Sequence, residues 1–314
     1  MDLEQKVKQT IKKYNLLSKE DKVVVALSGG KDSTSVLYIL HKLGYGISGL
    51  FINLYLGKWS EKNLENVKKF CDDLKIKLNV FDLKKEFGSG ICFIKDIVRE
   101  NKGMTGCSVC GILKRWILNK TAKKLGATKL VTGHNLDDEC QTVLMNFLKG
   151  NIELGFNFGP ATGAAYLEGV HPPTLNESRG NDKHKFSLKK IQENFVQRVK
   201  PLFFVPENEI KKYSKKMKFP VLYERCPCAF GTYRVETRGW MNEISDAEKL
   251  KIVKGWLKTV LKIRRGVENP SHPPSTASNQ LVNSRPRSEI KTCESCGEPC
   301  RGIVCKACEV LASI

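Results

Sequence analysis

The sequence predicts an α/β fold with a doubly wound parallel sheet, followed by a small cysteine-rich module at the C-terminus. From residue 21 onward, short β-branched runs alternate with longer segments of helical periodicity, the pattern of a parallel sheet with crossover helices. Glycine-rich or polar segments follow three of these runs, as ligand-binding turns do in such sheets. Two closely spaced cysteine pairs near the C-terminus predict the separate module.

A basic leading helix is expected within residues 1–20, over residues 3–17, and the main domain extends over residues 21–265. Its strands are expected at 23–27, 47–52, 77–81 and 129–132, and its helices at 32–43, 60–75, 111–125 and 137–148. The turns after the strands should share one edge of the sheet, and they comprise residues 28–33, 51–57 and 133–138.

Glycine, proline and polar residues interrupt this alternation at two places. Residues 151–197 are expected to be an insertion or mobile loop, after which Pro206 and Glu207 open a further helix. Residues 266–290 are expected to be a flexible linker that leads to the cysteine-rich module at residues 291–311.

The chain of 314 residues carries 53 Lys and Arg residues against 33 Asp and Glu residues, a formal net charge of +20. Such an excess favours a polyanionic partner such as a nucleic acid, although a solvated basic surface is the plainer alternative. No apolar run of about eighteen residues is present, so no membrane span is expected, and the charged N-terminus does not resemble a signal peptide. The grouped cysteines suit metal binding in a reducing compartment such as the cytoplasm.

The segment Ser28-Gly29-Gly30 lies between a strand and a helix and is a candidate phosphate site. Glycines let backbone N–H groups approach an anion closely, and the helix N-terminus adds positive potential. The segment is not a Walker loop, because Val25 and Asp32 stand where that pattern requires Gly and Ser or Thr. An ordinary glycine turn is the alternative interpretation.

The C-terminal cysteines have the spacing of a closed metal site. Cys293, Cys296, Cys305 and Cys308 form two CxxC pairs, a pattern that predicts four thiolates around a structural Zn²⁺. Cys300 lies between the pairs and is expected to be a spare thiol. Because so small a module has almost no apolar core, the metal is expected to stabilise its fold.

Further cysteines are grouped in the main domain. Cys107 and Cys110 precede the helix expected at 111–125, and a helix N-terminus with Lys114 and Arg115 nearby stabilises thiolates. We therefore expect reactive or metal-bound thiols there, with two core cysteines as the alternative.

Cys226 or Cys228 could join these thiols in space. Three thiolates on a four-iron cluster leave one iron without a protein ligand, and that iron can bind sulfide or substrate. Arg225, Arg234 and Arg238 nearby suit a phosphate-bearing partner, or they form a solvated basic turn. The remaining cysteines of this domain are expected in the core: Cys71, Cys92 and Cys140.

The segment TGHNLDDE, residues 132–139, follows a strand and begins a helix. Asp137 or Asp138 could hold Mg²⁺ or contact a nucleotide, because hard cations prefer carboxylate oxygens. The alternative is a helix cap followed by first-turn acids. His134 is as compatible with a buried structural role as with a catalytic one.

This chain resembles the TtcA/TtuA family of tRNA 2-thiouridine synthetases, in its branch with zinc ribbons. The resemblance rests on SGGKDS, CSVCG with the following KR, GHNLDDE, RCPCAF and the terminal cysteine pairs, and covers residues 10–150, 196–265 and 291–310. It implies a pyrophosphatase-loop domain that cleaves ATP between its α and β phosphates. It further implies that AMP is attached to the C2 oxygen of a tRNA uridine and that sulfur then displaces it, giving 2-thiouridine.

The resemblance also implies roles for individual residues. The site for ATP and Mg²⁺ would comprise Ser28, Gly29, Gly30, Lys31, Asp32, Ser33, Phe51, Gly133 and Asp138. Cys107, Cys110 and Cys226 would hold a [4Fe-4S] cluster, and the catalytic residues would be Lys114, Asp138 and Cys226.

Family members take sulfur from sulfide or from a ubiquitin-like protein with a C-terminal thiocarboxylate, and the family suggests a homodimer. Two departures are evident: no second zinc ribbon precedes the first helix, and Cys228 replaces a non-cysteine residue, so it could compete with Cys226 or bind a fourth iron. Two other functions are open, namely a cluster-free thiolase with a Cys107 and Cys226 persulfide relay, and a zinc-ribbon RNA-binding protein with a vestigial ATP site.

Overall fold

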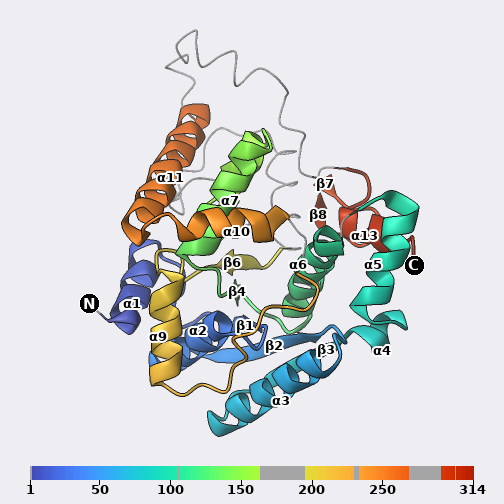
Figure 1. Ribbon diagram of the computed structural model, residues 1–314, viewed down its shortest axis with the longest axis horizontal. Coiled ribbons are helices and arrows are strands. Elements are labelled where there is room, and N and C mark those ends of the chain that lie inside the picture. The colour runs from blue at the N-terminus through green and yellow to red at the C-terminus, as the bar shows by residue number, and fades with distance from the viewer. Residues whose placement is uncertain (1, 105, 163–194, 230–232, 269–290, 301) are drawn as a thin grey trace.

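The computed structural model describes residues 2–104, 106–162, 195–229, 233–268, 291–300 and 302–314. Their main feature is a six-stranded sheet of order β3-β2-β1-β4-β6-β5, whose neighbours are all parallel except β6 and β5 (Figure 1). A small antiparallel sheet, β7-β8, lies in the C-terminal module. The predicted α/β fold with a doubly wound, mostly parallel sheet is confirmed.

The strands are β1 Val23–Leu27, β2 Ile47–Asn53, β3 Leu78–Asp82, β4 Lys129–Val131, β5 Ala161–Thr162, β6 Gln197–Val199, β7 Lys291–Thr292 and β8 Pro299–Cys300. The helices are α1 Leu3–Lys13, α2 Lys31–Lys42, α3 Lys58–Asp73, α4 Leu83–Phe87, α5 Ile91–Lys102, α6 Gly106–Lys124, α7 Leu136–Leu148, α9 Glu207–Lys216, α10 Tyr233–Asn242, α11 Asp246–Glu268 and α13 Lys306–Leu311, with a 3₁₀ helix, η1, at Ile152–Asn157.

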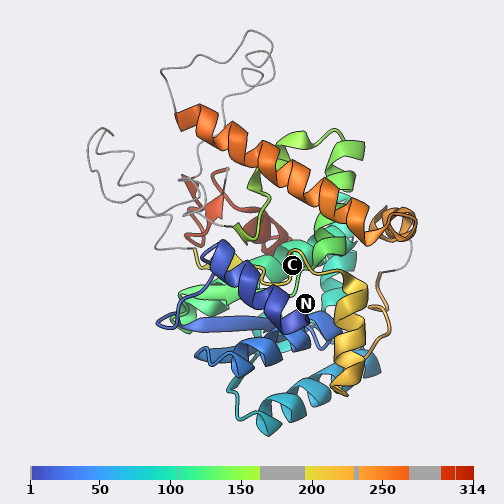
Figure 2. The ribbon, with the colours of Figure 1, turned by 90° about the vertical axis from the view of Figure 1, so that its left-hand side faces the viewer.

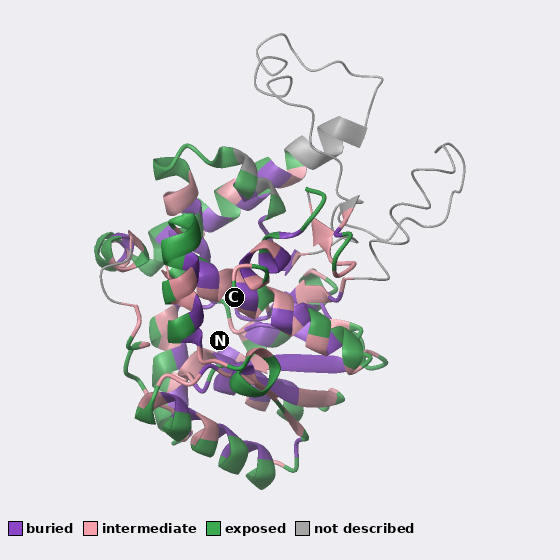
Figure 3. Cartoon of the chain, turned by 90° about the vertical axis from the view of Figure 1, so that its right-hand side faces the viewer, coloured by how far each residue is buried: buried purple, intermediate pink, exposed green. Residues whose placement is uncertain are grey.

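Helices cover both faces of the sheet. The apolar side chains of β1 point alternately to the two faces, so each face needs helices to bury them. Val23 and Val25 face a core shared with α1, α2 and α9, whereas Val24 faces the core shared with α6. β1 and the middle of β2 are buried, the edge strand β3 is not, and the outer faces of the helices are exposed (Figure 3). No helix among the described residues is long and apolar enough to cross a membrane.

A further helical layer lies beyond the edge of the sheet. α10 and α11 pack on α7 through Val143, Met241 and Leu257, which belong to one apolar cluster. α11 crosses the molecule on the side opposite to α3 (Figure 2). This layer matters for the site because it carries the arginines of α10 toward the N-terminus of α7.

The four predicted strands are present, with ends that shift by one residue at most. α6 begins at Gly106 rather than at residue 111, so Cys107 and Cys110 lie inside its first turns and not in a turn before it. The sequence patterns missed α5, α10, α11 and the two short strands β5 and β6. β5 and the first residue of β6 fall within residues 151–197, which the sequence pattern assigns to an insertion or loop.

The two interrupting segments are described only in part. Residues 163–194 of the 151–197 segment and residues 269–290 of the linker lie outside the described residues. α11 extends to Glu268, so residues 266–268 are helical. Pro206 is the N-cap of α9, as the sequence predicted for this helix start.

The C-terminal module packs against α6 (Figure 1). The indole N–H of Trp116 donates to Cys296 Sγ at 3.5 Å, and the Asn119 amide donates to the Glu298 carboxylate at 2.6 and 2.8 Å. The buried Asn119 also accepts the Val196 N–H at 2.9 Å. One side chain therefore joins α6, the residue before β6 and the module.

Replacing Asn119 by alanine tests this junction. Asn119→Ala removes the hydrogen bonds to Glu298 and to Val196, so we expect the free energy of unfolding in urea to fall by about 2 kcal/mol. Asn242→Ala, at the exposed end of α10, is the control and should cost less than about 0.5 kcal/mol. Equal losses in the two variants would contradict the role of Asn119.

Candidate nucleotide and cysteine sites

The glycine turn after β1 is held in place by its own side chains. Ser33 Oγ accepts the Ser28 N–H at 3.2 Å and donates to the Gly30 carbonyl at 3.1 Å. Gly29 has a φ of +79°, and a Cβ there would collide with the Asn63 side chain, so this position requires glycine. The turn leads directly into the N-terminus of α2, which favours anions.

The turn after β4 touches this glycine turn. A Cβ on Gly133 would lie 2.8 Å from the Ser33 backbone nitrogen, so any larger residue would push the two turns apart. Asn135 caps α7, and its amide donates to Asp32 Oδ1 at 3.2 Å. Strand order reverses between β1 and β4, and ligands of α/β sheets bind at such a point.

Opposite charges from several elements pair with one another at this edge. Lys31 pairs with the Glu207 carboxylate at 2.6 Å, and Arg238 of α10 contacts the same carboxylate. Arg234, one turn earlier on α10, pairs with Asp138 Oδ1 at 3.2 Å. These three cations are of the kind that bind phosphate oxygens, and a polyphosphate would supply the negative charge that the carboxylates supply here.

Burial and charge act in opposite directions on the two carboxyls of the site. Burial raises the pKa of Asp32 above its ordinary value. Burial also acts to raise the pKa of Asp138, but the charges of His134, Arg234 and Arg238 hold it below the ordinary value. Asp138 therefore stays ionised at neutral pH, as a cation-binding carboxylate must.

The two candidate acids of α7, Asp137 and Asp138, have different partners in the structure. Asp137 accepts the Glu207 N–H at 2.7 Å and pairs with the buried Lys249 at 2.7 Å, so its carboxylate is already used to join α7, α9 and α11. Asp138 pairs with the exposed Arg234, and its N–H donates to Asn135, whose amide in turn contacts Asp32 beside the glycine turn. The geometry thus favours Asp138 as the residue that would hold a cation.

The side chain of Phe51, which the resemblance places in the ATP site, is buried in the core. Its ring is 3 % exposed in the core shared with α2 and α3, and β2 continues beyond it to Asn53. Only the backbone of Phe51 can therefore border a nucleoside. His134, whose role the sequence left open, has its Nδ1 2.9 Å from Thr132 Oγ1.

The first turns of α6 lie against the loop that carries Cys226 and Cys228. Cys107 Sγ is 3.7 Å from the Cys228 carbonyl oxygen. Cys107 and Cys110 are about one helical turn apart and share one face of α6. Lys114, one turn further, is half-buried, and its ammonium makes no hydrogen bond or ion pair within the described residues.

Arg115 lies beside the cysteines of α6. Its guanidinium lies over Gly111, beside Cys110, at 3.4 Å from the position that a Cβ would take. Burial and the nearby charge of Arg234 both lower the pKa of Arg115, and Arg234 in turn pairs with Asp138. Arg115 and Arg234 thus place positive charge beside Cys110 and beside Asp138.

The remaining cysteines of the main domain divide into core and surface residues. Cys71 and Cys140 are buried, as predicted, and burial raises the pKa of each thiol to about 11. The prediction for Cys92 is wrong, because this residue is exposed on α5 and its Sγ lies 3.8 Å from Cys228 Sγ. The apolar stripe of α5 does not include position 92.

The C-terminal cysteines meet at one point, as predicted. The thiols of Cys293, Cys296, Cys305 and Cys308 lie within 4.8 Å of one another, and in the described part of the chain no other His, Cys, Asp or Glu group of three or more is so arranged. The Cys305 N–H donates to Cys293 Sγ at 3.2 Å, as is usual around metal-bound thiolates. Cys300 lies outside the group.

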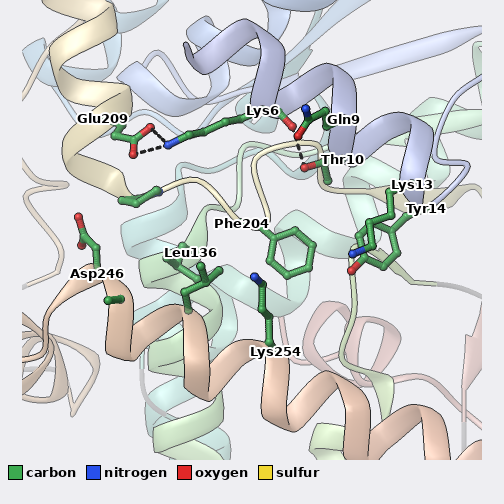
Figure 4. Close-up of a pocket in the computed structure, with 13 residues that line it drawn as sticks. Lys6, Gln9, Thr10, Lys13, Tyr14, Leu136, Phe204, Glu209, Asp246 and Lys254 are labelled. Carbon is green, nitrogen blue, oxygen red and sulfur yellow. Dashed lines mark hydrogen bonds and ion pairs between the residues drawn. The ribbon is translucent and has the colours of Figure 1, made fainter. Parts of the chain in front are cut away.

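A cavity of ≈ 410 Å³ is lined by residues of α1, α9, α11 and the start of α7 (Figure 4). Lys6 pairs with Glu209 on one side of it, and Lys254 points into it from α11. No residue of the turn 28–33 lines this cavity, so it is separate from the candidate phosphate site.

A comparison of the sequence with models of known protein families identifies the family of this chain. The PP-loop domain family matches residues 1–222, which is most of the chain. The chain belongs to the PP-loop family. The glycine turn Ser28–Ser33, at the carboxyl end of β1, lies within the matched residues, and we propose that it is the PP-loop.

The names of similar proteins refer to tRNA. The tRNA-5-methyluridine(54) 2-sulfurtransferase of Pyrococcus horikoshii is 32 % identical over 309 residues, which cover 98 % of this chain and 83 % of that protein. The tRNA 2-thiolation protein NcsA of Haloferax volcanii is 28 % identical and covers 99 % of this chain and 90 % of its own. The resemblance to tRNA 2-thiouridine synthetases is confirmed at the level of the family.

A solved structure supports the PP-loop fold. The U34-tRNA thiolase NcsA from Methanococcus maripaludis, solved with its [4Fe-4S] cluster, superposes with a TM-score of 0.63 over 82 % of this chain and 78 % of that chain. At 24 % identity this likeness shows the fold.

Replacing Gly133 by alanine tests the contact between the two turns. A methyl group 2.8 Å from Ser33 N would displace the PP-loop, so we expect ATP affinity measured by calorimetry to fall by about tenfold or more, with an unchanged circular dichroism spectrum. Gly46→Ala is the control, because a Cβ at Gly46 would meet nothing within 4 Å. Wild-type affinity in Gly133→Ala would mean that the contact does not shape the PP-loop.

Proposed function

We propose that this protein is a tRNA uridine 2-sulfurtransferase that uses ATP to activate the uracil C2 carbonyl and then replaces its oxygen by sulfur. The observation that carries the proposal is that α10 links the two sites. Its Arg234 and Arg238 pair with Asp138 and Glu207 beside the glycine turn, and the loop shortly before α10 in the chain lies against Cys107. Adenylation alone needs no thiols, so thiols linked to the nucleotide site through α10 point to a sulfur-transfer step. The names of the relatives support tRNA as the substrate class.

The PP-loop would bind the triphosphate of ATP through backbone N–H groups of Gly29 and Gly30 and the N-terminus of α2. Lys31 and Arg238, which share Glu207 here, would bind the β and γ phosphates. The uracil C2 oxygen attacks the α-phosphorus, the bond to the β-phosphate oxygen breaks, and pyrophosphate leaves. This step is needed because the C2 carbonyl is amide-like and a poor electrophile.

Asp138 is the carboxylate best placed to hold Mg²⁺ against these phosphates. It stays ionised because neighbouring cations outweigh the effect of burial, whereas Asp137 is already engaged by Lys249. Magnesium usually binds through one or two carboxylates together with phosphate oxygens, which fits a site built on Asp138.

Cys107, Cys110 and Cys226 suit a [4Fe-4S] cluster. The two α6 thiols share one helical face, the loop with Cys226 lies against Cys107, and none of the three is buried in an apolar core. Thiolates are the ligands that such clusters require. With three protein ligands the cluster would supply one iron that is open to sulfide.

Lys114 is the residue that would assist departure of AMP. When sulfur attacks C2, the bond between C2 and its oxygen breaks and AMP leaves with that oxygen, so negative charge grows on the phosphate. The ammonium of Lys114, which has no partner among the described residues, can neutralise it.

The charge of +20 and the C-terminal module would help to hold tRNA. In the module, Cys293, Cys296, Cys305 and Cys308 would bind structural Zn²⁺. The sulfur donor would be sulfide or a thiocarboxylate protein, and the working unit would be a homodimer. The protein would act in the cytoplasm, since some relatives are named cytoplasmic tRNA 2-thiolation proteins.

The function is tested by incubating anaerobically prepared protein with tRNA, ATP, Mg²⁺ and sodium sulfide, and measuring 2-thiouridine in the digested tRNA by mass spectrometry. Lys114→Ala should lower the rate by about 100-fold while ATP binding is kept, and Lys124→Ala at the exposed end of α6 should not. A wild-type protein that binds tRNA but forms neither 2-thiouridine nor AMP would instead be an RNA-binding protein with a vestigial ATP site.

Metal analysis tests the ligand set. We expect about four irons and one zinc per wild-type chain, and loss of the iron in Cys226→Ala with zinc retained. Cys228→Ala is the matched control two residues away and should keep its iron. Loss of iron in both variants would mean a fourth protein ligand, and no iron in any preparation would favour the cluster-free relay.

A further inference from the structure

Two thiols that have no role in the proposed reaction lie side by side next to it. Cys92 of α5 and Cys228 of the loop before α10 are 136 positions apart in the chain, yet their Sγ atoms are 3.8 Å apart. Both are free thiols, Cys92 exposed and Cys228 half-buried. Lys95 lies one turn beyond Cys92. Burial acts to lower the pKa of its ammonium, but the neighbouring Cys228 and Cys92 thiols hold that pKa above its ordinary value.

This thiol pair abuts the α6 cysteines. The Cys228 backbone carbonyl accepts from Cys107 Sγ at 3.7 Å, so Cys228 and Cys107 are direct neighbours. Cys92 lies on the outer side, where small molecules in solution can reach it.

The pair does not have the features of a metal site. Within the described residues, a group of three or more potential ligands occurs at the C-terminal cysteines and not around Cys92 and Cys228. Two thiols separated by 3.8 Å need only a small approach to form a disulfide, whereas two ligands of one four-iron cluster bind different irons and stay further apart. The geometry is that of a dithiol.

We propose that Cys228 and Cys92 form a sulfur-loading site, which accepts sulfane sulfur from a low-molecular-weight persulfide and releases it as sulfide beside Cys107. The site uses a different thiol pair from a Cys107 and Cys226 relay. Its purpose as a supply of sulfide for uridine thiolation rests on the proposed function, but the loading reaction itself needs neither ATP nor tRNA.

The reaction proceeds in two balanced steps. The Cys228 sulfur attacks the outer sulfur of the donor, a new S–S bond forms at Cys228, the S–S bond of the donor breaks, and the donor leaves as a thiol that takes the Cys228 proton. Cys92 then attacks Cys228 Sγ, the Sγ–Sγ bond forms, and hydrosulfide leaves with the electron pair of the broken bond. The sulfane sulfur gains two electrons, the two thiols lose them, and an external dithiol reduces the resulting disulfide.

The loading reaction is tested with glutathione persulfide as the probe, under anaerobic conditions without thiol reductant, ATP or tRNA. Wild-type protein should release about one sulfide per chain and yield a Cys92–Cys228 disulfide in the peptide mass spectrum. Cys92→Ser should release little sulfide and retain one extra sulfur on Cys228, and Cys228→Ser should retain none there. Cys300→Ser, a free thiol outside both sites, is the control and should behave as wild type.

A second measurement separates this proposal from the proposed function. With sodium sulfide as the donor, Cys92→Ser should form 2-thiouridine at the wild-type rate and keep its iron, whereas with glutathione persulfide its rate should fall by about tenfold or more. Three outcomes would each overturn the loading site. They are equal sulfide release by wild type and Cys92→Ser, disulfide formation without sulfide release, and loss of iron in Cys92→Ser. Absence of 2-thiouridine with sulfide in wild type would overturn the proposed function and leave the loading result standing.

Discussion

The close approach of Gly133 to the Ser33 backbone is the constraint on which the site depends. It brings the turns after β1 and β4 to van der Waals contact at the point where strand order reverses. Because α2 and α7 begin at these turns, the positive ends of both helices and the carboxylates of Asp32 and Asp138 come to the same edge. A larger residue at Gly133 would separate the phosphate-binding half of the site from its cation-binding half.

Charge pairing extends this edge to the cysteine loop. Glu207 lies between Lys31 and Arg238, and Asp138 holds Arg234, so α10 is drawn toward the PP-loop by the same groups that suit a polyphosphate. Since α10 directly follows the cysteine loop in the chain, the placement of its arginines also fixes where that loop can lie. The candidate nucleotide site and the thiols thus both depend on the position of α10.

The parts of the fold that were predictable are those with a local pattern. β1, its glycine turn and the first turn of α7 are recognisable because each is a continuous run of a few residues with a strong preference. Asp137 and Asp138 are adjacent and chemically identical, so only the position of Lys249 could show which one is engaged. Cys92 is predicted wrongly because helix α5, whose apolar face excludes it, is not recognised in the sequence. Its closeness to Cys228, 136 positions away, arises from tertiary structure alone.

The central claim is that the PP-loop transfers AMP to the C2 oxygen of a uridine. Its most direct test uses tRNA labelled with ¹⁸O at the uracil C2 position, with ATP and sulfide, and measures by mass spectrometry where the label goes. If the C2 oxygen attacks the α-phosphorus, each 2-thiouridine formed leaves one ¹⁸O in the phosphate of AMP. Unlabelled AMP, with the ¹⁸O in water or in pyrophosphate, would contradict the account.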